Sequence, residues 1–582
     1  MARDDAAARG AAELRAARAE SRWLFWSVGI FSFFVNLLML TGPLYMMNVY
    51  DRVLGSRSIA TLVALSVLVL FLYACMGILD FVRGRVMGRV GARFQARLDR
   101  RVFSASLRAS SFGRAPREAQ SGLRDLEATQ KGFTSPAFMS LFDLPFAPMF
   151  FAGIFIFHPW LGYLALGGAV VLVILALANQ VATKRPLETA MQTTIAAETM
   201  GQQVRHETET IQSLGMREAA FLRWQQARGR SLEATIAAQD AGGTYSALIK
   251  SIRLFLQSAM LGLGALLVLE GWATAGVMIA SSILLGRALA PIETIVGQWA
   301  VLQRAREGWS NLSTLLGEVP EENRRTALPR PKARLELDQV TVVPPGEQQA
   351  TLRMMSFRVE PGQAVGVIGT SGAGKSTLAR AITGTWRVAA GKIRLDGAAL
   401  DQYDPDVLGK YVGYLPQRVA LFDGTIKENI ARLSPEPDDA AVVRAAQAAA
   451  AHEMILKLPD GYDTRVSSNG GRLSGGQIQR IGLARALYGD PVVVVLDEPN
   501  SNLDNDGSQA LNAAIRSLKE KGAAVLIMAH RPAAIQECDM LLMIEGGARR
   551  AFGPKEEVLR EMVANHRQIA GSGQGVPVGS VT

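Results

Sequence analysis

The sequence contains little cysteine. Only Cys75 and Cys538 occur in its 582 residues. Cys75 lies in an apolar run and Cys538 in the more polar second half, so the pair has neither a metal-ligand spacing nor the pattern of a disulfide framework. We expect both to be reduced structural residues.

Charged residues are also scarce for a chain of this length. They make up 20% of the sequence, hydrophobic residues make up 49%, and the mean hydropathy is +0.15. Such a balance requires long apolar runs, which excludes an ordinary soluble protein. The length alone predicts two to four domains.

A secretory signal peptide is missing from the start of the sequence. Residues 1–22 are rich in Ala, Arg and Glu and lack a short apolar core followed by a small-residue cleavage site. We expect an N-terminal cytoplasmic helix over residues 1–22.

The formal net charge of +10 raises the possibility of nucleic-acid binding. However, no nucleic-acid-binding motif accompanies the charge. The basic residues cluster beside apolar runs, as in the segment that contains Arg83, Arg85, Arg89, Arg93, Arg97, Arg100 and Arg101. Cytoplasmic loops of membrane proteins carry such an excess, so we expect a membrane protein with no nucleic-acid partner.

Six apolar stretches, each near the ~20 residues that a membrane span requires, fill the first half. They occupy residues 23–49, 59–82, 137–157, 160–182, 247–269 and 274–300. Short turns join them in pairs, and long basic segments with helical periodicity separate the pairs. We therefore predict a transmembrane domain over residues 23–314, with both termini in the cytoplasm and helices that extend well beyond the membrane.

Ionisable residues fall within or near these stretches. They are Asp143, Lys250, Arg253, Arg287 and Glu293. Such groups either face a polar translocation path or lie at the membrane interface, and the sequence leaves both interpretations open.

Prolines at three positions of the spans are expected to break or kink their helices. These are Pro145, Pro148 and Pro291.

The pattern changes after the last apolar stretch. Residues 315–334 mix prolines and charges and are predicted to be a linker. Residues 335–570 alternate short β-rich runs with helical segments, which is typical of an α/β nucleotide-binding domain. We expect residues 571–582, rich in Gly, Ser and Val, to be a disordered tail.

A phosphate-binding loop is the strongest chemical signal. A β-rich run over residues 364–368 precedes a complete P-loop, and we expect a helix from Ser376. Backbone N–H groups of such a loop surround phosphates, Lys375 provides charge to the β- and γ-phosphates, and Ser376 offers its hydroxyl to Mg²⁺. The predicted ATP-binding residues are Gly369, Thr370, Ser371, Gly372, Ala373, Gly374, Lys375, Ser376 and Thr377.

Two acidic residues end a second buried strand. Val492 to Leu496 are all apolar, and Asp497 and Glu498 follow directly. In a parallel sheet these carboxylates lie beside the P-loop. Asp497 is placed to hold Mg²⁺, and Glu498 is placed to polarise the attacking water.

A third motif identifies the family. The run Leu473, Ser474, Gly475, Gly476, Gln477 resembles the signature motif of ABC ATPases, and Gln417, Asp504 and His530 stand at the positions of the other ABC motifs. The resemblance implies an α-helical six-span membrane domain of the type I ABC exporter kind followed by an α/β P-loop nucleotide-binding domain.

The resemblance also implies roles for these residues. Gln417 would contact the γ-phosphate and the metal and couple them to the membrane domain, and His530 would contact the γ-phosphate. The signature residues Ser474, Gly475, Gly476 and Gln477 would complete the ATP site of a second copy, with Asp504 at the seam. We therefore expect a homodimer that hydrolyses ATP at two sites.

Within this family the chain is most similar to the type I secretion ATPases, in particular the PrtD-like branch. The similarity rests on residues 344–346 (Pro-Pro-Gly), 497–504 and 142–145 (Phe-Asp-Leu-Pro). It implies ATP-driven export of a polypeptide with a C-terminal signal across the bacterial inner membrane, with a periplasmic adaptor and an outer-membrane channel as partners. We also expect the chain to lack an N-terminal peptidase-like domain.

Two departures from the family pattern concern single residues. Pro344 stands where many ABC ATPases have an aromatic residue that stacks on adenine, and Ser468 stands where exporters often have a glutamate. The alternatives are a lipid or small-molecule exporter of the same architecture and a non-transporting ABC regulator.

Overall fold

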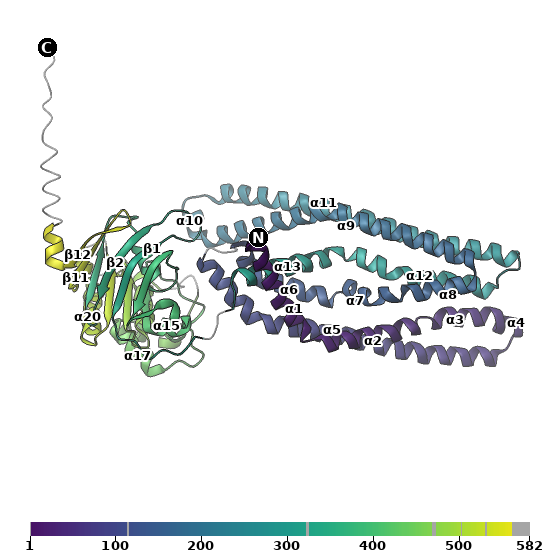
Figure 1. Ribbon diagram of the computed structural model, residues 1–582, viewed down its shortest axis with the longest axis horizontal. Coiled ribbons are helices and arrows are strands. Elements are labelled where there is room, and N and C mark those ends of the chain that lie inside the picture. Colours follow the sequence, from purple (N-terminus) through teal and green to yellow (C-terminus); the bar gives the residue numbers. More distant parts are fainter. Residues whose placement is uncertain are drawn as a thin grey trace, which may run out of the picture. The chain divides into compact units, whose positions relative to one another are not determined.

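The structure is a computed structural model that forms two compact units, a helical unit as far as Glu321 and an α/β unit after it (Figure 1). It describes residues 2–112, 116–321, 325–467, 473–501, 503, 505–529 and 532–561.

Six helical segments among the described residues of the first unit are long and apolar enough to cross a membrane. The first consists of α2 (Arg22–Leu38), α3 (Thr41–Asn48), the π-helix η1 (Val49–Val53) and α4 (Leu54–Ser56). The others are α5 (Ile59–Phe112), α7 (Pro136–Asp143) continued by α8 (Ala147–Phe157), α9 (Pro159–His206), α11 (Arg217–Leu269) and α12 (Ala275–Gly297). The six predicted spans are confirmed as helices.

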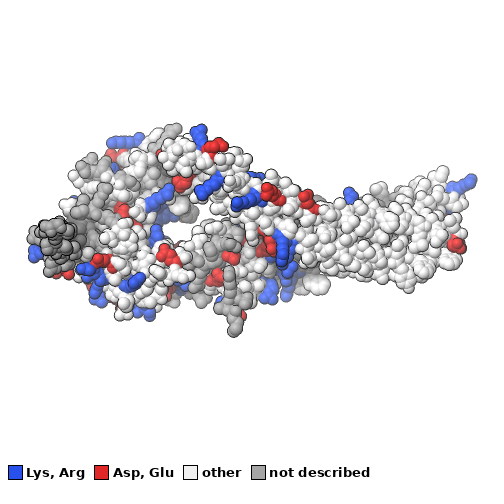
Figure 2. All heavy atoms as spheres, turned by 90° about the horizontal axis from the view of Figure 1, so that it is seen from above, with Lys and Arg blue, Asp and Glu red and all other residues white. Residues whose placement is uncertain are grey.

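Three of these helices are far longer than a membrane requires. Helices α5, α9 and α11 contain 54, 48 and 53 residues, which corresponds to about 70–80 Å at ~1.5 Å per residue. The apolar interior of a bilayer is only ~30 Å thick, so more than half of each helix extends beyond it. Figure 2 shows charged side chains gathered away from the apolar half of this unit, which is almost bare of them except at its tip.

Proline breaks the third span at one point. Pro145 lies in a short 3₁₀ turn, η2 (Leu144–Phe146), which separates α7 from α8, and Pro148 lies in the first turn of α8. Both positions tolerate a missing backbone donor. The third predicted interruption differs, because α12 continues through Pro291 to Gly297.

The first unit also contains helices outside the spans. These are α1 (Ala2–Ala19), α6 (Pro116–Thr134), α10 (Thr208–Ser213) and α13 (Trp299–Glu318). Helix α1 packs closely on α13. The backbones are so near that a Cβ atom added to Gly317 would lie 1.9 Å from the carbonyl oxygen of Ala6. Small residues allow this close approach.

The α/β unit is built on a six-stranded sheet in the order β12-β11-β3-β10-β9-β6. The central strands are parallel, and their apolar side chains alternate between two cores: Val493 and Val495 pack on one face, Val494 and Leu496 on the other. Its strands are β3 (Ala364–Ile368), β6 (Val412–Leu415), β9 (Val493–Asp497), β10 (Ala524–Met528), β11 (Met540–Glu545) and β12 (Ala548–Pro554).

A second sheet and several helices complete this unit. The sheet has the order β2-β1-β4-β5, with strands β1 (Leu335–Val342), β2 (Leu352–Val359), β4 (Ala390–Leu395) and β5 (Ala398–Ala399). A short strand pair is formed by β7 (Gly424–Thr425) and β8 (Arg465–Val466). The helices are α14 (Lys375–Ile382), α15 (Pro405–Tyr411), α16 (Ile426–Ile430), α17 (Asp439–Ala448), α18 (His452–Leu456), α19 (Gly475–Leu487) and α20 (Asn505–Glu520).

Candidate functional site

The P-loop connects β3 to α14, as the sequence predicts, although the helix begins at Lys375 rather than Ser376. Gly374 has a φ of +104°, in the left-handed region that favours glycine. A Cβ atom there would lie 2.8 Å from Leu352 Cδ2, so the position tolerates no larger side chain without movement. The loop thus turns sharply and ends at the N-terminus of a helix, which favours phosphate binding.

Lys375 is held inside the loop. Its Nζ donates hydrogen bonds to the carbonyl oxygens of Gly369 and Thr370, at 2.9 and 3.0 Å. Burial lowers the pKa of Lys375, while the carboxylates of Glu498 and Asp497 oppose that shift. The ammonium group therefore lies between the loop and the acidic end of β9.

Asp497 is buried at the end of β9, and the Ser376 hydroxyl lies close enough to its carboxylate to lower the pKa. Burial raises the pKa of Asp497, against the lowering effects of Ser376, Arg380 and Lys375. Its Oδ1 has no hydrogen-bond partner among the described residues. A buried carboxylate oxygen without a partner, beside a hydroxyl, suits a hard divalent cation.

Gln417 and Glu498 are also brought together. They follow β6 and β9, which pair in parallel, and the Gln417 amide donates to Glu498 Oε2 at 3.0 Å. Glu498 has a φ of +51°, which is uncommon for a residue other than glycine. Strained backbone of this kind is frequent at functional sites.

The signature residues form the start of α19. Ser474 caps this helix by accepting from the Gln477 backbone N–H at 3.3 Å, and its own N–H donates to the Gln477 side chain at 2.9 Å. Gly475 and Gly476 occupy the first turn. The helix N-terminus is thereby preorganised to receive an anion.

Two predicted site residues, Asp504 and His530, lie outside the described residues, as does Ser468. Pro344 is buried, and the loop from residue 343 to residue 351 contains no aromatic side chain.

Arg380 and Tyr414 are members of the site that sequence reasoning missed. The Arg380 guanidinium lowers the pKa values of Tyr414 and Asp497, and it lies over the Trp386 ring at 4.6 Å. Arg380 is on α14 just after the P-loop, and Tyr414 is paired with Val495 across the sheet. Both residues could have been found from the sequence by their distance to known motifs: Arg380 lies five residues after Lys375 of the P-loop, and Tyr414 lies three residues before Gln417.

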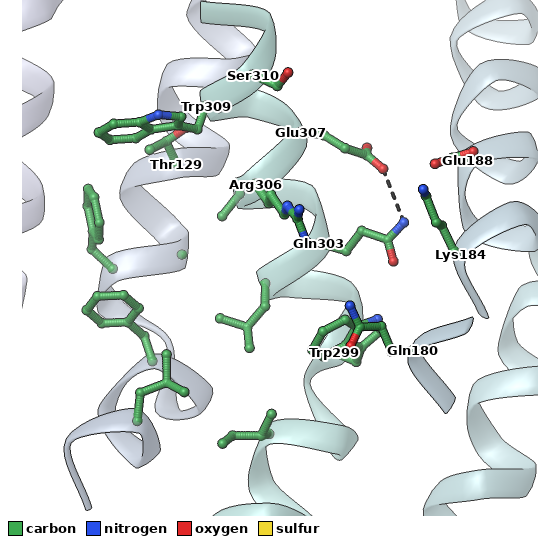
Figure 3. A pocket seen from close by; sticks show the side chains of 17 residues that line it. Thr129, Gln180, Lys184, Glu188, Trp299, Gln303, Arg306, Glu307, Trp309 and Ser310 are labelled. Carbon is green, nitrogen blue, oxygen red and sulfur yellow. Dashed lines mark hydrogen bonds between the residues drawn. The ribbon is translucent and has the colours of Figure 1, made fainter. Parts of the chain in front are cut away.

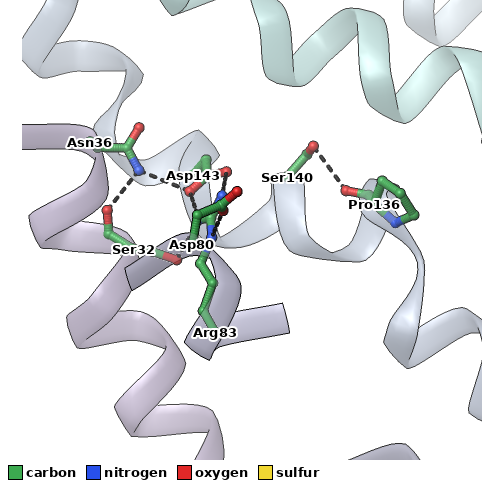
Figure 4. Close-up of polar contacts among 7 residues, drawn as sticks. All are labelled: Ser32, Asn36, Asp80, Arg83, Pro136, Ser140 and Asp143. Carbon is green, nitrogen blue, oxygen red and sulfur yellow. Dashed lines mark hydrogen bonds and ion pairs between the residues drawn. The ribbon is translucent and has the colours of Figure 1, made fainter. Parts of the chain in front are cut away.

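The ionisable residues of the spans are mostly paired. Asp143 accepts from Arg83 Nη1 at 2.6 Å and from Asn36 at 2.8 Å, and Arg83 also bonds Ser32 and Asp80 (Figure 4). This network joins α2, α5 and α7, so Asp143 is engaged between helices. Of the other ionisable residues, Arg253 and Glu293 form an ion pair at 2.7 Å, whereas Lys250 and Arg287 are exposed.

A cavity of about 740 Å³ lies among α6, α7, α9, α12 and α13 (Figure 3). Trp299 and Trp309 line it together with Lys184 and Glu188, and Gln303 donates to Glu307 at 3.3 Å. Burial raises the pKa of Glu307.

Comparison with known families matches both units. The model described as "ABC transporter transmembrane region" matches residues 25–289, and the model described as "ABC transporter" matches residues 352–501. The second range contains the P-loop, Gln417, the signature and the acidic strand end.

The curated relatives cover nearly the whole chain. The type I secretion system ATP-binding protein PrsD of Rhizobium meliloti (strain 1021) is 43% identical over 552 residues, 95% of each chain. The cyclolysin secretion/processing ATP-binding protein CyaB of Bordetella pertussis (strain Tohama I) is 29% identical over 92% of this chain and 76% of its own length.

A solved structure shares the fold. A bacterial Atm1-family ABC exporter with ATP bound superposes with a TM-score of 0.78 at 21% identity, over 96% of this chain and 99% of that chain. The chain therefore belongs to the ABC transporters, in the family of type I secretion system ATP-binding proteins.

Proposed function

We propose that the chain exports a polypeptide with a C-terminal signal across the bacterial inner membrane, as the ABC component of a type I secretion system. The observation that carries this proposal is the 43% identity to PrsD across 95% of both chains. As an ATP-hydrolysing ABC transporter with six spans, the chain is a multi-pass inner-membrane protein with its nucleotide-binding domain in the cytoplasm.

The roles proposed for the site residues follow from their positions. The P-loop amides and Lys375 bind the phosphates of ATP. Glu498 accepts a proton from the attacking water, and the Gln417 amide, which donates to Glu498 at 3.0 Å, orients that carboxylate. Asp504 and His530 keep the roles implied by the family resemblance.

Mg²⁺ is proposed as the metal that accompanies ATP. Ser376 and Asp497 would hold it, together with Gln417, because the Asp497 Oδ1 is free beside the Ser376 hydroxyl. When bound, the ion would neutralise charge on the phosphates.

The proposed partners are a second copy of the chain, a periplasmic adaptor, an outer-membrane channel and the exported polypeptide. The second copy is needed because the chain holds one P-loop and one signature, and the signature is expected to complete its partner's site. The two composite sites would then be related by two-fold symmetry.

The ATPase rate of the purified protein in lipid tests the proposed substrate. Peptides from the C-termini of proteins encoded beside the chain would be added, with scrambled peptides as the matched control. A rate that changes with the native peptides alone supports polypeptide export. A rate that is unmoved by these peptides but altered by lipids or small amphiphiles favours the lipid or small-molecule exporter instead.

A further inference from the structure

A separate cavity of about 560 Å³ lies where α1 ends and α2 and α7 begin. Two arginines and four aromatic residues dominate its lining: Arg18, Arg22, Phe25, Trp26, Phe138 and Phe142. Phe25 and Phe142 stack with ring centroids 6.4 Å apart, and Phe138 meets Phe142 edge-on at 5.8 Å. The apolar wall is therefore formed by aromatic rings that hold one another in place.

The cavity lies at the level where two spans enter the membrane from the cytoplasm. Arg22 is the first residue of the first span, and Pro136 is the first residue of the third. Trp23 and Trp26 are 72% and 67% exposed, as expected of aromatic residues at a membrane–water interface. With both termini in the cytoplasm, as the sequence predicts, the cavity would face the inner leaflet at headgroup depth.

The charge of the cavity is uncompensated. No acidic residue lines it, and neither Arg18 nor Arg22 has a carboxylate partner within the described part of the chain. Glu20, which lies between them in sequence, pairs instead with Arg97 at 3.1 Å. The first turns of α2 and α7 contribute the partial positive charge of two helix N-termini, and the last turn of α1, which contains Arg18 and Ala19, contributes the partial negative charge of one C-terminus. The two full charges of Arg18 and Arg22 therefore dominate the cavity.

We propose that this cavity binds an anionic phospholipid of the inner leaflet. Arg18 and Arg22 would hold the headgroup phosphate, since a guanidinium group can donate two parallel hydrogen bonds to phosphate. The acyl chains would lie against Phe25, Phe138 and Phe142. Basic pockets between spans on the cytoplasmic side are suited to such headgroups.

Lipid retention by the full chain tests this proposal. The protein is placed in nanodiscs of phosphatidylcholine mixed with phosphatidylglycerol, delipidated with detergent, and the phosphatidylglycerol that remains bound is counted by native mass spectrometry over a titration. Each arginine near the surface is worth about 1 kcal/mol, or roughly five- to sixfold in affinity for an anionic lipid, so Arg18→Gln/Arg22→Gln should weaken retention about thirty-fold. The matched control is Arg9→Gln/Arg15→Gln, which removes the same charge from α1 outside the cavity.

A second variant blocks the cavity without changing its charge. Gly29 lines the cavity, and a Cβ atom added there meets nothing within 4 Å, so Gly29→Leu should fill the space without a clash. Gly167→Leu on α9 is equally open and serves as control. If Gly29→Leu loses phosphatidylglycerol and Gly167→Leu does not, the lipid occupies this cavity. Two results would overturn the proposal. One is an equal loss of bound phosphatidylglycerol in the Arg18/Arg22 and Arg9/Arg15 variants. The other is that the unaltered protein retains phosphatidylcholine as well as it retains phosphatidylglycerol.

Discussion

At the scale of single residues, the backbone of Glu498 adopts an energetically unfavourable conformation. Glu498 has a φ of +51°, which costs about 1–3 kcal/mol for a residue other than glycine. Its backbone N–H bonds the Met528 carbonyl at 3.0 Å, and its side chain bonds Gln417. These contacts fix the direction of the carboxylate, which is what a general base requires.

Glu498→Gln should lower the ATPase rate by about 10²–10⁴-fold, because glutamine keeps the size of the side chain but cannot accept the proton. ATP should still bind, so a stable ATP-loaded dimer should accumulate. The rate is measured by phosphate release and the dimer by size-exclusion chromatography. Glu520→Gln, on the exposed surface of α20, is the control, and unchanged turnover in Glu498→Gln would contradict the role of this residue.

Asp497→Asn should abolish hydrolysis and yet stabilise the nucleotide-free protein at neutral pH. Burial raises the folded-state pKa of Asp497, so its ionised form costs stability above that pKa. As the pH falls, the folded state binds the proton first, and the cost vanishes below the unfolded pKa of about 3.9.

The thermal unfolding midpoint, measured without Mg²⁺ across this pH range, checks the expectation. The rise in the unfolding midpoint caused by Asp497→Asn should be largest at neutral pH and should shrink as the pH is lowered. A gain that grows on acidification would show that Asp497 is stabilised, not penalised, by its surroundings.

At the scale of helices, buried polar contacts fix how the spans pack. The Arg83 and Asp143 side chains are only 8% and 14% exposed, and their pair connects α5 to α7, with Asn36 adding α2. An ionisable residue inside a membrane domain is expected to be paired in this way.

Removal of one member of the Arg83–Asp143 pair should lower the free energy of unfolding. Arg83→Met alone leaves a buried carboxylate and should destabilise the protein by about 3–5 kcal/mol, whereas Arg83→Met/Asp143→Leu should recover most of that loss. Thermal unfolding in detergent measures both. Asp80→Asn is the control, because the Asp80 side chain is 60% exposed and its pair with Arg83 should be worth at most about 1 kcal/mol.

The sequence predicted elements better than it predicted contacts. The spans, β3, β9 and the P-loop follow from local patterns, since hydrophobic length and glycine spacing are properties of neighbouring residues. The Arg83–Asp143 pair joins residues 60 apart and depends on how helices pack. The position of Arg380 could have been noticed from its spacing to the P-loop, but its contact with the Trp386 ring and the two cavities described above depend on tertiary arrangement, which no motif encodes.

At the scale of the whole molecule, function is expected to require two chains. In the proposed dimer, one chain would contribute a P-loop with Glu498, and a second would contribute the signature at Ser474. Each unit of the chain supplies one part of the activity: the α/β unit hydrolyses ATP, and the helical unit provides the membrane passage.

Mixing two inactive chains tests the shared site. Lys375→Ala and Ser474→Arg should each reduce the ATPase rate of a homodimer to background. A co-purified mixed dimer should regain activity, because one of its two sites combines an intact P-loop with an intact signature. A mixed dimer that stays inactive would indicate that each chain completes its own site.

Secretion itself is the most direct test of polypeptide export. Cells that lack the chain but retain its adaptor and channel would be complemented with the wild-type chain or with Glu498→Gln, and a protein encoded beside the chain would be quantified in the medium. We predict secretion with the wild-type chain, none with Glu498→Gln, and none when the C-terminal segment of the secreted protein is deleted. Secretion that continues with Glu498→Gln, or that is indifferent to the C-terminal segment, would contradict ATP-driven export of a polypeptide with a C-terminal signal.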